Sequence, residues 1–147
     1  MKGWLLDTNV ISEWRKPKPS PKVIAFLEAQ PRSKLFTSTV CFAELRRGAG
    51  MSKDHGSRLK LESWIEVELR NYFQGKTLDM SEDTLIFALD IVDKANAARK
   101  PVSQVDAWFA ATALFHNLCV VTRDVKDLIN SGVPVLNPWT GERFNGA

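Results

Sequence analysis

The hydrophobic and polar positions of the chain follow two patterns that alternate from the N-terminus onward. Short runs in which most side chains are apolar predict strands buried on both faces. The segments between those runs, several with apolar residues at spacings of three and four, predict helices. The expected strands span 4–6, 35–38, 77–80, 118–122 and 134–136, and the expected helices span 11–15, 23–29, 40–47, 57–73, 83–99 and 103–116. Strands that alternate with helices predict a three-layer α/β/α sandwich with a mainly parallel sheet.

The breaks between these segments carry residues that end helices. A proline-rich connection spans 17–21, and Gly48 and Gly50 follow the helix expected at 40–47. Lys100-Pro101 ends the helix expected at 83–99. The 147 residues contain no internal repeat, and their hydrophobic content of 44% is enough to fill one core. We therefore expect a single domain over residues 1–140, followed by a short C-terminal tail at 141–147.

The formal net charge of +3 hides a local contrast. Basic residues gather in two polar stretches, Arg15, Lys16, Lys18 and Lys22 in the first, and Arg46, Arg47, Lys53, Arg58 and Lys60 in the second. If several acids share one pocket, the remaining surface is distinctly basic and suits a polyanion. For any one of these residues, an ordinary solvated surface is the simpler explanation.

The two cysteines, Cys41 and Cys119, lie in apolar segments, where free cysteines commonly act as small core residues. A disulfide framework is therefore not expected, which fits a reducing compartment. The apolar run near the N-terminus is too short for a signal peptide, and no run approaches the length that crosses a membrane. The sequence predicts a soluble cytoplasmic protein without a membrane association.

Four acidic residues are placed where a parallel sheet binds its ligands. Asp7 follows the first strand and Asp124 follows the strand at 118–122, while Glu44 and Asp106 lie early in helices that begin on the same side. Ligands of such sheets bind outside the carboxyl ends of the strands. The sequence thus predicts that the four carboxylates meet at one edge.

Each acid also has a local explanation that the sequence leaves open. Asp106 fits a capping box opened by Ser103, Glu44 could pair with Arg47 one turn away, and Asp7 and Asp124 could each cap a turn. Independent capping does not require all four acids to lie at the same edge, so a shared purpose explains their positions more economically.

Clustered carboxylates raise one another's pKa and are tolerable as fully ionised groups only beside a cation. Ligands that are all oxygen select Mg²⁺, with Mn²⁺ as a substitute. His55 and His116 are far apart in the sequence, which argues against zinc. There is no phosphate-binding glycine loop and no Gly-x-Ser-x-Gly elbow, and Asn9 stands where an aspartyl-phosphate phosphatase would have a second Asp.

At this point the motifs resemble those of a known family. Residues 5–13 (Leu-Leu-Asp-Thr-Asn-Val-Ile-Ser-Glu) resemble the opening motif of PIN-domain nucleases, especially the VapC and FitB toxins of bacterial toxin–antitoxin pairs. Residues 42–48, 105–107 and 121–124 are similar to the second, third and fourth acidic motifs, and 135–139 resembles the ending of the FitB subgroup. The resemblance spans residues 3–139, and the ordered agreement of several motifs is far more specific than any one of them.

The resemblance implies a role for each motif residue. Asp7, Asp106 and Asp124 would bind the metal, and Glu44 would hold a metal-bound water or act as general base. The supporting residues would be Thr8, Asn9, Thr122 and Asp127, and Asp127 is an alternative to Asp124 as the fourth acid. Arg46, Arg47 and Arg123 would bind the RNA backbone at the rim of the site.

The function implied by this resemblance is a Mg²⁺-dependent endoribonuclease that acts as the toxin of a toxin–antitoxin pair and cleaves RNA, with tRNA prominent among VapC targets. Its implied partners are a cognate antitoxin, a second copy in a homodimer, and operator DNA only through the antitoxin. The alternative is a non-catalytic nucleic-acid-binding module of a toxin–antitoxin DNA-regulatory complex. The intact set of acids speaks against that alternative.

Overall fold

A computed structural model describes all residues from 1 to 147 and confirms the mainly parallel sheet. The strands lie in the order β3-β2-β1-β4-β5-β6, and every neighbouring pair is parallel except β5 and β6. The strands are β1 (Gly3–Leu6), β2 (Leu35–Ser38), β3 (Thr77–Leu78), β4 (Leu118–Val121), β5 (Val135–Leu136) and β6 (Arg143–Phe144).

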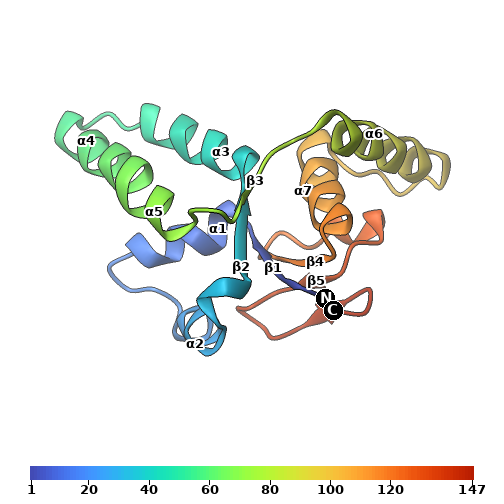
Figure 1. The fold of residues 1–147 in the computed structure, drawn as a ribbon, viewed down its shortest axis with the longest axis horizontal. Helices are drawn as coiled ribbons and strands as arrows, with labels where there is room; N and C mark the ends of the chain where they lie inside the picture. Colours follow the sequence, from blue (N-terminus) through green and yellow to red (C-terminus); the bar gives the residue numbers. More distant parts are fainter.

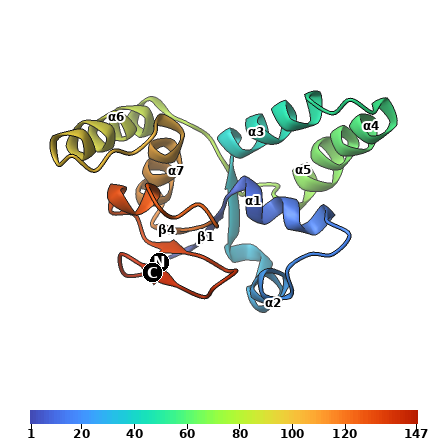
Figure 2. The same ribbon diagram turned by 180° about the vertical axis from the view of Figure 1, so that it is seen from behind.

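Helices cover both faces of this sheet, as the alternating pattern predicts. Helices α1 to α5 lie on one side and α6 and α7 on the other, while the two termini lie close together (Figures 1 and 2). The α-helices are α1 (Thr8–Ile11), α2 (Pro21–Ala29), α3 (Thr39–Gly50), α4 (His55–Ser63), α5 (Arg70–Tyr72), α6 (Glu82–Ala97) and α7 (Gln104–Phe115). The remaining turns are η1 (Ser12–Arg15), η2 (Arg32–Lys34), η3 (Trp64–Leu69) and η4 (Leu128–Ser131), of which η3 is π-helical.

Three regions depart from the elements expected from the sequence. The helix expected to end at Arg47 continues through Gly48 and ends at Gly50 as α3. The helix expected at 57–73 is formed by α4, the π-helical η3 and α5 in succession, so its hydrogen-bonding pattern changes within the helix. The strand at 134–136, expected to be the last, is followed by β6, which pairs with β5 in the antiparallel direction. Gly141, with φ of +81°, allows the chain to reverse before β6. A strand of two residues is too short to show an alternating pattern in the sequence. Strand β6 forms because it pairs with β5.

The core centres on β1 and β4, whose residues Leu5, Leu6, Val120 and Val121 are fully buried. Helix α7 presents Ala107, Ala110, Ala111 and Ala113 as buried small side chains, which let it pack closely within the core. Cys41 and Cys119 are both buried and unpaired with each other, as expected for core residues. None of the helices has the length and apolar character needed to span a bilayer.

The register of β1 and β4 brings their carboxyl ends to the same edge of the sheet. Leu6, the last residue of β1, pairs with Val121, the last residue of β4. Asp7 and Thr122 follow directly, and the Asp7 backbone amide donates to the Val121 carbonyl at 3.0 Å. This edge therefore places side chains from distant parts of the sequence next to one another.

Candidate active site

All four predicted carboxylates line one pocket at the carboxyl edge of the sheet. The pocket has a volume of about 260 Å³ and is lined by Asp7, Thr8, Asn9, Glu44, Val105, Asp106, Phe109 and Asp124. Asp7 comes from the end of β1, Glu44 from α3, Asp106 from the first turn of α7, and Asp124 from the loop after β4. Two apolar residues, Val105 and Phe109, were not foreseen as lining residues, although their positions one before and three after Asp106 place them beside it on α7.

Asp7 is held by two hydrogen bonds. Its Oδ1 accepts from the Thr8 backbone amide at 2.7 Å and caps α1, and its Oδ2 accepts from the Thr122 hydroxyl at 2.7 Å. Burial nevertheless raises the pKa of Asp7 from 3.8 to about 6, because desolvation of the charged form outweighs these two bonds. The negative charges of Glu44 and Asp124 raise the pKa further. A bound cation would favour the ionised form of Asp7.

Thr122 and Asn9 join the ends of β1 and β4 through a hydrogen-bond network. The Thr122 hydroxyl, fully buried, accepts from Asn9 Nδ2 at 3.1 Å and from the Asp124 backbone amide at 3.0 Å while it donates to Asp7. Asn9 Nδ2 also donates to Asp124 Oδ2 at 3.1 Å, and Asn9 Oδ1 accepts from the Arg123 backbone amide at 3.3 Å. These bonds fix where the Asp124 carboxylate and the start of the following loop lie.

Glu44 is exposed and accepts a hydrogen bond from the Thr8 hydroxyl at 3.0 Å. The ion pairs of the structure do not include one between Glu44 and Arg47, so the local pairing considered from the sequence does not occur. Glu44 therefore faces the pocket with its negative charge uncompensated by a basic side chain.

Asp106 takes part in a helix cap and also lines the pocket. The Ser103 hydroxyl accepts from the Asp106 backbone amide at 3.1 Å, which is the capping bond expected for α7. The Asp106 side chain is partly buried, and desolvation is the largest cause of its raised pKa. The charges of Asp127 and Asp124 add to that rise, while the Ser103 side chain, as a hydrogen-bond partner of the carboxyl group itself, lowers the pKa. The capping alternative is thus correct for the backbone, but it does not remove the carboxylate from the pocket.

Two further pockets flank the carboxylate pocket and each contains a predicted RNA-contacting arginine. Arg47 lines a pocket of about 410 Å³ that shares Glu44 and Val105 with the carboxylate pocket. Arg123 lines a pocket of about 350 Å³ together with Asp106, Asp124, Val125, Lys126 and Asp127. Asp127 thus lies beside the carboxylate pocket and does not line it.

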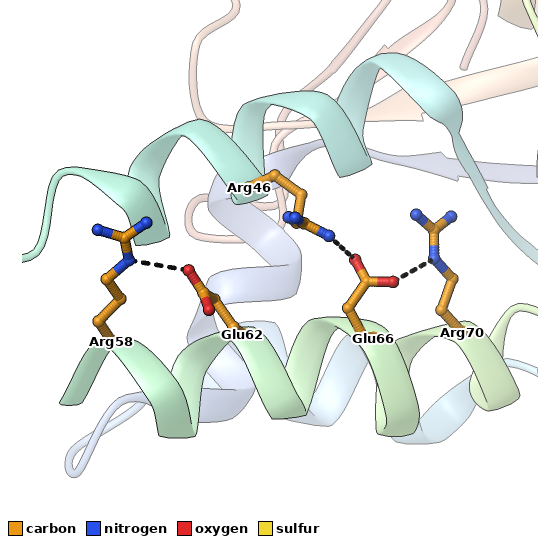
Figure 3. Close-up of polar contacts among 5 residues, drawn as sticks. All are labelled: Arg46, Arg58, Glu62, Glu66 and Arg70. Carbon is orange, nitrogen blue, oxygen red and sulfur yellow. Dashed lines mark hydrogen bonds and ion pairs between the residues drawn. The ribbon is translucent and has the colours of Figure 1, made fainter. Parts of the chain in front are cut away.

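Arg46 is placed differently from Arg47. Its guanidinium forms an ion pair with Glu66 at 2.6 Å, and Glu66 also pairs with Arg70 at 3.6 Å (Figure 3). Arg46 is two positions from Glu44 on α3 and so points to another side of the helix, whereas Arg47, three positions from Glu44, shares its side. The structure therefore brings Arg47 and Arg123 to the site and directs Arg46 toward η3.

The donor atoms that face the carboxylate pocket are carboxylate, amide and hydroxyl oxygens. No three side chains among the histidines, cysteines and acids lie close enough together to coordinate one ion directly. Mg²⁺ usually keeps several waters and binds through one or two protein carboxylates, so this oxygen set fits Mg²⁺ better than an ion that requires a complete protein cage. His55 and His116 do not line the pocket, and the residues present do not suit zinc.

Comparison with known proteins gives consistent similarities over nearly the whole chain. Residues 4–129 match the family described as "PIN domain". The chain is 33% identical to Toxin FitB of Neisseria gonorrhoeae, covering 92% of this chain and 97% of that protein, and 33% identical to VapC ribonuclease Y4jK of Sinorhizobium fredii, covering 92% and 96%. A solved structure of FitAB bound to an IR36 DNA fragment contains a chain with 32% identity and a TM-score of 0.87, covering 92% of this chain and 95% of that one.

Proposed function

This chain belongs to the PIN domain family, and from that premise we propose that it is a metal-dependent endoribonuclease that acts as the toxin of a toxin–antitoxin pair. The observation that carries the proposal is the single pocket lined by four carboxylates from four separate segments. Two relatives with 33% identity over 92% of the chain have the names of a toxin and a ribonuclease.

We propose that Asp7, Asp106 and Asp124 hold Mg²⁺ at this pocket, one or two of them directly and the rest through waters that the ion retains, and that Mn²⁺ can substitute. Asp124 is preferred to Asp127 as the fourth acid because it lines the same pocket as Asp7 and is held there by Asn9. When bound, the ion would supply an activated water and neutralise charge that builds up on the phosphate oxygens.

Within this proposal the protein residues have separate tasks. Asp7 is oriented by Thr8 and Thr122, so its carboxylate lies in a fixed position at the floor of the site. Glu44 is exposed and uncompensated by a basic residue, and it is therefore the group best placed to accept a proton from the attacking water. Thr8 fixes the orientation of the Glu44 carboxylate through its hydroxyl.

Arg47 and Arg123 line two different pockets that adjoin the carboxylate pocket, which supports an RNA strand that passes along it. Each lines a pocket that shares acids with the central one, Glu44 in one case and Asp106 with Asp124 in the other. Cations in such positions bind phosphates on either side of the scissile bond and position the strand with little reading of sequence. We propose RNA as the substrate class, with tRNA as the first RNA to test.

We propose a cognate antitoxin as the main protein partner and a homodimer as the state of the toxin itself. The solved structure of FitAB bound to an IR36 DNA fragment contains a chain similar to this one, which supports a complex that binds DNA, and we propose that this chain reaches operator DNA only through the antitoxin. The protein would then be kept inactive by its antitoxin and would cleave RNA when released. The rival function is a DNA-regulatory module without catalysis. It would need the same partner, but it would not depend on an intact carboxylate pocket.

The test is cleavage of total RNA by the purified chain with Mg²⁺ or with EDTA, compared with Asp7→Asn. We expect Mg²⁺-dependent cleavage that falls by at least about 100-fold in Asp7→Asn, since this substitution removes a carboxylate charge from the proposed metal site. Asp93→Asn makes the same chemical change on an exposed position of α6 outside the pocket and should leave cleavage unchanged. Cleavage that persists in EDTA and in Asp7→Asn contradicts the proposal. Antitoxin-dependent DNA binding without any RNA cleavage would favour the rival function.

A further inference from the structure

Arg123 lies among acids without pairing with any of them. It shares a pocket with Asp106, Asp124 and Asp127, yet its guanidinium takes part in none of the four ion pairs of the structure. Three other arginines on the surface, Arg46, Arg58 and Arg70, do pair with a nearby glutamate. Something other than charge attraction therefore determines where the Arg123 side chain lies.

The aromatic ring of Trp139 is the contact that holds it. The Arg123 Cζ atom lies 4.3 Å from the centroid of the Trp139 ring, which is within the range of a favourable cation–π interaction. An arginine that stacks on an indole keeps its N–H groups in the guanidinium plane, and these donors remain free to bind an anion. The backbone of Arg123 is fixed as well, because its amide donates to Asn9 Oδ1 at 3.3 Å.

Trp139 is itself held by a tight turn between β5 and β6. The side chain of Asn137, which is buried, accepts from the Trp139 backbone amide at 2.9 Å. The backbone of Asn137 closes the turn, since its carbonyl accepts from Gly141 at 2.8 Å and its amide donates to Glu142 at 2.9 Å. The ring is thus presented by rigid backbone that the pairing of β5 with β6 stabilises.

We propose that Trp139 is a positioning residue that holds the Arg123 guanidinium off the site carboxylates and keeps it available to a phosphate of the RNA strand. The proposal rests on the function proposed above and extends it to the turn at 137–141. Without the ring, the flexible side chain of Arg123 would fold onto Asp106, Asp124 or Asp127. Such a contact would reduce phosphate binding and would also neutralise acids of the site.

One other acid lies near Arg123, and it does not compete for the guanidinium. The charge of Arg123 makes a small contribution to the lowered pKa of Glu13, of which the bond from Lys16 is the largest cause. Glu13 already accepts from the Ser20 backbone amide at 2.9 Å and pairs with Lys16 at 2.5 Å. Its carboxylate is therefore already paired with residues of its own segment.

The experiment measures the affinity of the full chain for a short fluorescein-labelled single-stranded RNA in EDTA at several salt concentrations. We expect Arg123→Gln to weaken binding about tenfold and to reduce the slope of log K against log salt by about 0.7, the value for one phosphate contact on a single strand. Trp139→Leu should change both quantities in the same direction, and Trp139→Phe, which keeps an aromatic ring, should restore most of the loss. Adding Trp139→Leu to Arg123→Gln should cause no further loss.

Arg123→Lys decides the question if Trp139→Leu does not fold. A lysine keeps the charge but cannot stack as a planar guanidinium, so we expect weaker binding and a lower salt slope, close to those of Arg123→Gln. Arg32→Gln is the matched control. Arg32 also stacks on an aromatic ring, with its Cζ 4.1 Å from the centroid of Tyr72, but it lies just before the amino end of β2, whereas the site lies at the carboxyl ends of the strands. Arg32→Gln should retain the affinity of the unmodified chain to within about twofold.

Three outcomes would overturn the proposal. The first is an Arg123→Lys variant that binds like the unmodified chain, which would mean that charge alone matters. The second is a Trp139→Leu loss that is equally large in the Arg123→Gln background, which would mean that the ring acts independently of the arginine. The third is an unmodified chain that neither binds nor cleaves RNA, which would also overturn the proposed function, whereas the first two outcomes leave that function intact.

Discussion

The carboxyl edge of the sheet and the outer surface formed by α3, α4 and η3 both gather acids and arginines, but they arrange the charges in opposite ways. On the outer surface two acids lie against bases, since Glu62 pairs with Arg58 at 2.9 Å and Glu66 is shared by Arg46 and Arg70 (Figure 3). At the carboxyl edge, Asp7, Glu44, Asp106 and Asp124 face one pocket, and none of them pairs with a base.

The pKa values express this difference. On the outer surface, the hydrogen bond from Arg46 is the main reason why the pKa of Glu66 is lowered, so folding favours its charge. In the pocket, burial raises the pKa values of Asp7 and Asp106, so folding disfavours their charges. Opposite charges that neutralise each other stabilise the fold, whereas carboxylates left without partners leave the site ready for a cation and cost stability until it is bound.

The largest expected effect is on the free energy of unfolding of Asp7→Asn in the absence of metal. The pKa of Asp7 is about 6 in the folded chain, compared with 3.8 for an unperturbed aspartate. The folded state therefore keeps its full stability below pH 3.8, where Asp7 is neutral, and loses stability as the pH rises through 6 and Asp7 becomes charged. The loss is at most about 3 kcal/mol. Asparagine has no charge to desolvate, so Asp7→Asn should have the higher free energy of unfolding at pH 7.5.

Urea denaturation in EDTA at pH 4.5 and pH 7.5 measures this effect. The gain in Asp7→Asn should be largest at pH 7.5 and should shrink at pH 4.5. The gain in free energy of unfolding should stay below about 3 kcal/mol, because the asparagine amide would face the Thr122 hydroxyl, which already accepts two hydrogen bonds. A variant less stable than the unmodified chain at pH 7.5 would mean that the unpaired charge of Asp7 is not a cost to the fold.

The next test removes the buried hydroxyl that joins the two strand ends. Thr122→Val keeps the shape of the side chain but loses the bond to Asp7 and the acceptor of Asn9 and Asp124. We expect a loss of about 2 kcal/mol and a weaker response to Mg²⁺. Thr37→Val is the matched control, since Thr37 is equally buried but its hydroxyl contacts no carboxylate and makes a long bond of 3.5 Å to the Leu6 carbonyl. Equal losses in the two variants would show that the network around Thr122 has no special weight.

Binding of Mg²⁺ should recover part of the stability that the pocket lacks. At ten times the dissociation constant, a ligand that binds only the folded state contributes about 1.4 kcal/mol. Thermal melting in MgCl₂ should therefore show a higher midpoint than in NaCl of equal ionic strength, and Asp7→Asn should lose most of that difference. A midpoint that rises equally in both proteins would place the ion elsewhere.

The sequence predicts the site to the extent that the site follows from the sheet. The continuous apolar runs of β1 and β4 are readable as buried strands, and the rule that parallel strands bind ligands at their carboxyl ends then places Asp7 and Asp124 together. The spacing of residues along α3 already distinguishes Arg47 from Arg46, because only Arg47 lies on the same side of the helix as Glu44. Reading both arginines simply as basic residues overlooks that spacing.

Contacts that depend on tertiary pairing cannot be read in the same way. Strand β6 has two residues and exists through its pairing with β5, and the stacking of Trp139 on Arg123 joins segments that follow different strands. The π-helical turns of η3 likewise keep the apolar spacing of an ordinary helix and give no separate signal. In each case packing between distant segments decides the structure, so local propensity is insufficient.

The smallest effect belongs to the outer surface, where the charges are already paired. Glu66→Gln removes the acid shared by Arg46 and Arg70, and we expect a loss of less than about 1 kcal/mol because the side chains are largely exposed and the pairs are screened by salt. RNA cleavage should remain within about twofold of the unmodified chain, since Glu66 lies outside the three pockets around the site. Denaturation in low and high salt, followed by the cleavage assay, measures both. If cleavage falls as far as it does in Asp7→Asn, the two surfaces are coupled and the separation between structural and functional charges fails.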